Sequence, residues 1–110
     1  MANTFKNSNL DITSTGQDIY TCPSSTTAIV LSLRISNVDG TSNDTITAEW
    51  TDSDGTTKSY LAYTVSVPAD SVLELAGDSK IVLEASDKIT LTGGSASGDL
   101  EAFMSILEIS

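Results

Sequence analysis

Histidine is absent from the sequence, and the chain has one cysteine, Cys22, and two prolines. Without histidine, no Ser-His-Asp or Cys-His nucleophile can be assembled. A single cysteine can form neither an internal disulfide nor a cysteine-rich zinc site. The sequence also lacks a phosphate-binding glycine loop, and its scattered carboxylates form no distinctive acid–base pair. We therefore expect a protein that is not an enzyme, with no catalytic residue, no cofactor and no bound metal.

Basic residues are scarce. Lys and Arg total 5 against 15 Asp and Glu, which gives a formal net charge of −10 and a pI near 4.1. Nucleic-acid surfaces need clustered positive charge, so we expect no direct contact with DNA or RNA. The first ten residues lack the apolar core of a signal peptide, and no run approaches the ~20 apolar residues of a membrane span. We expect no membrane association.

Serine and threonine are abundant, with 32 of the 110 residues. Threonine favours strands and serine favours turns, whereas both are poor helix formers. The stretch TTAIVLSLRISNVDG at 26–40 alternates at period two, with an Asp-Gly reversal at its end. Its alternation indicates a central strand of a packed sheet. The expected inward face of this strand is Ile29, Leu31, Leu33 and Ile35.

Similar patterns recur along the whole chain at spacings of about 8 to 14 residues, as in β-sandwiches. We predict an all-β fold, an antiparallel two-sheet β-sandwich, jelly-roll-like, of eight to nine strands. A small-residue loop at 93–98 should precede the last strand. The two most central strands should be Thr26–Val38 and Leu100–Ile109. The remaining strands are expected at 7–13, 18–22, 45–52, 58–67, 72–75, 81–84 and 88–92, and the core at Ile29, Leu31, Leu33, Ile35, Trp50, Leu83, Leu91, Phe103 and Leu107.

Three stretches could form a metal-binding or reactive site, and each also has a simpler structural interpretation. Asp52-x-Asp54-Gly55 resembles the start of a calcium loop, but the rest of an EF-hand is missing, so a hairpin turn is preferred. Asp39 and Asp44 bracket a loop with the same two interpretations. Cys22, before Pro23, is expected to be a buried structural thiol. Aromatic residues that could form a sugar-stacking platform are Tyr20, Trp50, Tyr60 and Tyr63.

Five phrases, in this order, carry a family resemblance: MANTFKN, IYTCPSSTTAIVLSLRISNVDGT, VSVPADSVLEL, KIVLEASDKITL and SGDLEAFMSILEIS. Together they resemble a family of small virion structural proteins of tailed bacteriophages and prophages. In that family the segment at 83–89 often has a glycine where this chain has Ser86. The resemblance implies a non-enzymatic accessory subunit, of the capsid-decoration kind or at the neck or tail, assembled in the host cytoplasm and located in the virion.

The implied partners are other virion proteins and further copies of the chain, with a homotrimer favoured. The alternative is a carbohydrate-binding or host-adhesion β-sandwich module. Residues 1–8 are polar apart from Phe5 and are expected to form an N-terminal arm, with residues 9–110 as the single sandwich domain. An arm of this kind becomes ordered on a partner. We therefore predict that Phe5, Lys6 and Asn7 contact a partner, with Phe5 as the buried anchor.

Overall fold

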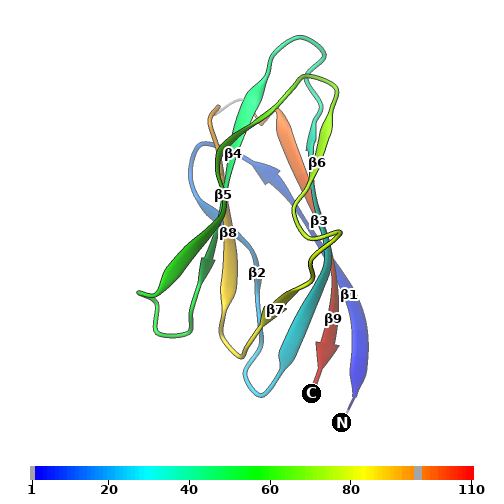
Figure 1. The fold of residues 1–110 in the computed structure, drawn as a ribbon, viewed down its shortest axis with the longest axis vertical. Helices are drawn as coiled ribbons and strands as arrows, with labels where there is room; N and C mark the ends of the chain where they lie inside the picture. Colours follow the sequence, from blue (N-terminus) through cyan, green and yellow to red (C-terminus); the bar gives the residue numbers. More distant parts are fainter. Residues whose placement is uncertain (1, 96–97) are drawn as a thin grey trace.

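The computed structural model describes residues 2–95 and 98–110 and contains two antiparallel sheets (Figure 1). The expected two-sheet, nine-strand sandwich is confirmed. The first sheet has the order β1-β9-β3-β6, with β7 also paired to β3, and the second has the order β2-β8-β4-β5. Their bounds are β1 Asn3–Ile12, β2 Gln17–Thr21, β3 Thr27–Asn37, β4 Asp44–Thr51, β5 Lys58–Val67, β6 Val72–Glu74, β7 Ile81–Leu83, β8 Lys88–Gly93 and β9 Leu100–Ile109.

The sheets face each other across a core of aliphatic side chains, as alternating strands require. The molecule is elongated, at 47 × 27 × 21 Å, with both termini at the same end (Figure 1). The strands β3 and β9 are paired with each other and each has a neighbour on its other side, so both are central as expected. The small-residue loop expected at 93–98 includes residues 96 and 97, which lie outside the described part of the chain.

The first strand differs from the expected N-terminal arm. β1 begins at Asn3, and it pairs with β9 without interruption from Asn3↔Ile109 to Ile12↔Leu100. No boundary separates residues 3–8 from the sandwich, and the contacts that order them come from the same chain. The pairing partner is about a hundred residues away in sequence, so the local polarity of this segment gave no sign of it.

The inward face of β3 changes along the strand. Ala28 and Val30 are fully buried at its start, and Leu33 and Ile35 are fully buried beyond a β-bulge between Val30 and Ser32. An extra residue reverses which positions face the core. The expected single face was therefore right for Leu33 and Ile35 and wrong for Ile29 and Leu31, which are only half-buried.

The expected core face of β9 was also wrong. Leu100, Ala102, Met104 and Ile106 point inward, while Phe103 is 46% exposed and Leu107 is half-buried on the outer face. Both faces of this strand are apolar, so alternation alone did not distinguish them. Elsewhere Leu83 and Leu91 are fully buried as predicted, and Trp50 packs against the core while half-buried.

Ser86 occupies the turn where the resembling family often has glycine. Its φ is +70°, in the left-handed region that glycine adopts without a steric cost, and its N–H donates to the carbonyl of Cys22 at 2.8 Å. The conformation explains why glycine suits this position, and serine maintains it here.

Candidate interaction surface

The outer face of the first sheet carries a continuous line of apolar side chains. Phe5 of β1 lies opposite Leu107 of β9, Leu107 lies opposite Ile29 of β3, and Ile29 lies opposite Val82 of β7. We call these four residues the apolar row. Phe5 is 75% exposed and Val82 is 57% exposed, at the two ends of the row. Four neighbouring strands thus present apolar groups to solvent on one face.

Phe103 extends this surface along β9. Between Phe5, Leu31 and Phe103 the face is hollowed into a shallow depression of about 360 Å³, which Ser105 also lines. Exposed apolar groups that gather in one place mark contact surfaces more often than exposed residues scattered singly. The outer face of the first sheet is therefore the candidate site for a protein partner.

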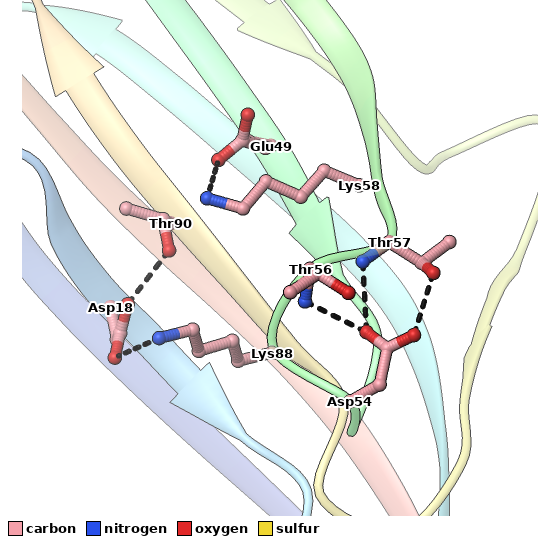
Figure 2. Close-up of polar contacts among 8 residues, drawn as sticks. All are labelled: Asp18, Glu49, Asp54, Thr56, Thr57, Lys58, Lys88 and Thr90. Carbon is pink, nitrogen blue, oxygen red and sulfur yellow. Dashed lines mark hydrogen bonds and ion pairs between the residues drawn. The ribbon is translucent and has the colours of Figure 1, made fainter.

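The outer face of the second sheet carries paired charges beside the exposed tyrosines of its edge strand β5. Lys58 forms an ion pair with Glu49 at 3.7 Å, and Lys88 forms one with Asp18 at 3.5 Å. The hydroxyl of Thr90 also donates to Asp18 at 2.7 Å (Figure 2). Exposed pairs of this kind contribute little stability, but they keep a sheet face hydrated. The two outer faces of the sandwich thus differ in character.

The three residues predicted to contact a partner do not share one face. Phe5 and Asn7 lie at alternate positions of β1 and belong to the outer face. Lys6 lies between them, and its amine forms an ion pair with Glu108 at 3.1 Å. Contact of these residues with a partner stays a prediction, and Lys6 has a partner within the chain already.

Glu108 joins the two sheets at the end of the sandwich where the termini lie. It is 8% exposed, and besides Lys6 it accepts a hydrogen bond from the hydroxyl of Tyr20 of β2 at 2.5 Å. The hydrogen bond from Tyr20, followed by Lys6, holds the pKa of Glu108 below its ordinary 4.5. Burial, together with the same bond, raises the pKa of Tyr20. This bridge joins residues far apart in the chain, so no local pattern predicts it.

In the possible calcium loop, the Asp54 carboxylate is bonded within its own turn. Asp54 accepts hydrogen bonds from Thr57 Oγ1 at 2.7 Å and from the N–H groups of Thr56 and Thr57, both at 2.8 Å (Figure 2). These bonds, the Thr57 hydroxyl first, lower the pKa of Asp54 to about 2. The side chain thus organises its own hairpin turn, as the simpler interpretation expected.

Asp52 instead lies beside Glu84 and Asp87, with one oxygen of each within 4.8 Å of the others. Asp87 is 1% exposed and already accepts hydrogen bonds from Trp50 Nε1 at 3.3 Å, Ser53 N at 3.1 Å and Glu84 N at 2.9 Å. Its oxygens are engaged in holding two turns against the core. The cluster is accounted for by this structural role, and the indole N–H of Trp50 finds the partner that its position required.

The loop bracketed by Asp39 and Asp44 follows the simpler interpretation as well. Asp39 Oδ1 accepts from Thr41 N at 2.8 Å and from Ser42 N at 3.2 Å, and Asp44 Oδ1 accepts from the N–H of the next residue at 2.8 Å. Their carboxylates bond to the local backbone, as Asx residues commonly do in turns.

Cys22 is buried, as predicted, at 1% exposure. Its thiol lies 3.3 Å from the carbonyl of Thr26, to which it donates. Burial raises the pKa of the Cys22 thiol, which disfavours the reactive thiolate. The residue has the environment of a structural thiol and not of a nucleophile.

Two of the four aromatic residues considered for a sugar platform come together. Tyr60 and Tyr63 of β5 are 57% and 63% exposed, and their ring centroids are 4.7 Å apart at 57°. Tyr20 and Trp50 are half-buried and bonded to Glu108 and Asp87, so they do not join this pair. A platform of two tilted rings remains on the edge strand of the second sheet.

Within residues 2–95 and 98–110, no helix is long and apolar enough to cross a membrane. No protein-family model and no curated protein matches the sequence.

Two solved structures have a similar fold. One is a protein of the Bacillus endospore appendages, described as disulfide-linked pili, with a TM-score of 0.56, 18% identity, and coverage of 99% of this chain and 87% of that one. The other is a chain of infectious bursal disease virus, Gx strain, with a TM-score of 0.55 and 12% identity. The alignment covers 98% of this chain but 30% of the viral chain. At these identities the likeness establishes a shared two-sheet fold.

Proposed function

We propose that the chain is a non-enzymatic structural subunit of a tailed-bacteriophage virion. It attaches to the capsid shell, or to the neck or tail, through protein–protein contacts made by the outer face of its first sheet. The observation that carries this proposal is the apolar row, because it places Phe5 and Val82 in solvent at opposite ends of one sheet face. A face of this kind gains stability when a partner covers it.

Three further points support a structural role. The chain has no histidine that could activate a nucleophile, and its one cysteine, Cys22, is buried. The sequence resembles virion structural proteins, and the two proteins of similar fold come from a spore appendage and a virus. Since Cys22 is the only cysteine and is buried, attachment of the folded chain would be non-covalent, unlike the linkage named for the pili.

The test is incorporation of point variants into phage particles. Phe5→Asp places a charge in the apolar row, and burying an unpaired carboxylate at an interface costs several kcal/mol. We expect the amount of the variant on purified particles to fall at least about tenfold, since a tenfold loss needs only about 1.4 kcal/mol. The matched control is Ser66→Asp, which adds the same charge to an exposed position of β5 on the second sheet.

Full incorporation of Phe5→Asp, or an equal loss with Ser66→Asp, would contradict attachment through the first sheet. Point variants serve better than deletion of residues 2–7, because deletion would remove half of β1 and uncover β9.

Carbohydrate binding at the Tyr60–Tyr63 pair is the second candidate function. Two exposed rings whose centroids lie 4.7 Å apart on an edge strand are a small stacking surface. A glycan array compared between the native chain and Tyr60→Ala separates the two functions. A saccharide signal that the substitution removes would favour an adhesion module.

A further inference from the structure

β1 is an open edge of the first sheet. Ala2 and Ser110 exchange both backbone hydrogen bonds, each at 2.9 Å, so even-numbered residues of β1 are bonded to β9. In an antiparallel pair the intervening residues point their N–H and C=O groups the other way. The backbone groups of Asn3, Phe5 and Asn7 therefore point away from β9. Within the described chain, no hydrogen bond reaches them.

The remaining edges are short, irregular or covered. β2 has five residues and a register shift at Asp18/Tyr20, and β5 shifts register twice against β4. On the far side of β3, the strands β6 and β7 have three residues each, and side chains cover the gap between them. There Glu74 Oε2 accepts from Leu33 N at 2.7 Å, and Lys80 Nζ donates to the carbonyl of Leu31 at 3.1 Å.

Among the described strands, β1 alone is a long edge with an unbroken register. Natural sheets usually protect such an edge with a bulge, a proline or a charge. β1 has no proline, and its one lysine is held by Glu108. The edge is therefore suited to accept a further strand.

The charge distribution indicates what that strand is. The chain has a net charge of −10, yet its first acidic residue is Asp11. The first half of β1 has no acidic residue, and its one charge, Lys6, is paired with Glu108. It therefore offers little attraction for a basic partner and no acidic group that would repel a second copy. In Figure 1 this half of β1 is the outermost strand beside β9, at the end with both termini. Its surface fits a second copy of itself.

We infer that two copies of the chain pair antiparallel through β1, with Phe5 opposite Phe5 of the second copy on a two-fold axis. In this register Asn3 lies opposite Asn7, and Lys6 lies opposite Thr4. The two-fold axis is perpendicular to the sheet, so both apolar rows lie on the same face and join end to end. One row would then cross eight strands, with an aromatic pair at its centre.

Neighbouring registers are less favourable. The free backbone groups of β1 belong to its odd-numbered residues, so odd-numbered residues of the two copies must lie opposite each other. A two-fold axis through Lys6 would place two like charges opposite each other, which is destabilising. An axis through Asn7 would place Phe5 opposite Asn9 and interrupt the apolar row. The register through Phe5 avoids both problems.

This inference goes beyond the proposed function and does not depend on it, because it is tested on the purified chain alone. It predicts two-fold pairing in place of the homotrimer expected from the sequence. The pairing would also double the length of the surface that we propose for attachment.

The first test is the mass in solution by light scattering at about 100 µM, because small interfaces often associate only in the micromolar to millimolar range. The native chain should show twice its mass of 11.5 kDa. Asn7→Pro removes an N–H that the monomer does not use and should give a monomer that still unfolds cooperatively. The control Asn7→Thr keeps that N–H and should still dimerise.

The second test fixes the register by disulfide trapping. Opposite residues of a hydrogen-bonded pair have Cα atoms about 5.5 Å apart, within the range of a disulfide. Asn3→Cys mixed with a mass-tagged Asn7→Cys should form the mixed disulfide on oxidation, while each variant alone should form little. The native Cys22 is buried and does not interfere.

A monomeric native chain, or dimerisation unaffected by Asn7→Pro, would overturn the inference. So would efficient crosslinking of Asn7→Cys with itself, which would place the axis at Asn7. None of these three results would change how the particle experiment with Phe5→Asp and Ser66→Asp is interpreted.

Discussion

Replacing Met104 with alanine should lower the free energy of unfolding by about 2–5 kcal/mol, because the side chain is fully buried and its removal leaves a cavity. Replacing the preceding Phe103 with alanine should cost less than about 1 kcal/mol, because that ring is 46% exposed on the outer face. Chemical denaturation of both variants measures the difference. The larger residue should be the less costly one to remove.

This comparison also tests the direction in which β9 faces. If Phe103→Ala were the more destabilising variant, the strand would be rotated by one residue, and Leu107 and Phe5 would not lie on an outer row. The denaturant dependence of the unfolding free energy should be the same for both variants, since neither changes the surface exposed on unfolding by much.

Replacing Glu108 with alanine should have the second large effect, about 2 kcal/mol or more. Glu108 accepts the Tyr20 hydroxyl and pairs with Lys6, and its loss leaves the half-buried hydroxyl without its acceptor. Glu108→Gln keeps the shape and one acceptor, so it should cost less. Equilibrium unfolding at neutral pH ranks the two variants.

The same bridge should make stability depend on pH on the acid side. The folded state holds the pKa of Glu108 below 4.5, so its carboxylate binds protons less tightly in the folded than in the unfolded chain. The contribution is therefore fully present above about pH 4.5 and is lost as the pH falls through the folded pKa. Glu108→Gln should remove this part of the acid sensitivity. If the unfolding free energy of that variant fell at acid pH as steeply as that of the native chain, Glu108 would not be held by the bridge.

The positions of the strands could be read from the sequence, because alternation and turn residues are local. β5 was predicted with its observed bounds, and β3 within one residue at each end. The exception was the first strand, whose only local signals are a few polar residues around Phe5. This segment forms a strand because it pairs with β9, at the other end of the chain. Pairing at that distance produces no periodic pattern in the local sequence.

The direction in which strands face was harder to predict. In a strand that is apolar on both sides, such as β9, the sequence does not show which alternate residues face the core. In β3, the bulge changes which alternate residues face the core partway along the strand. The polar groups that serve distant backbone, such as Glu74 at Leu33 and Asp87 at Ser53, were also missed. Phe5 was identified because a large apolar residue in a polar segment is unusual. Its place at the end of a row of four residues needed the register of the sheet.

The measurement that tests the attachment surface most directly is oxidative footprinting, read by mass spectrometry, of the isolated chain and of the chain in purified phage particles. Both outer faces carry exposed aromatic residues, Phe5 and Phe103 on the first sheet and Tyr60 and Tyr63 on the second. We predict that Phe5 and Phe103 become several-fold less reactive in particles, at roughly the level expected when an interface excludes water, while Tyr60 and Tyr63 stay reactive. Unchanged reactivity of Phe5 and Phe103 together with protection of the tyrosines would contradict attachment through the first sheet.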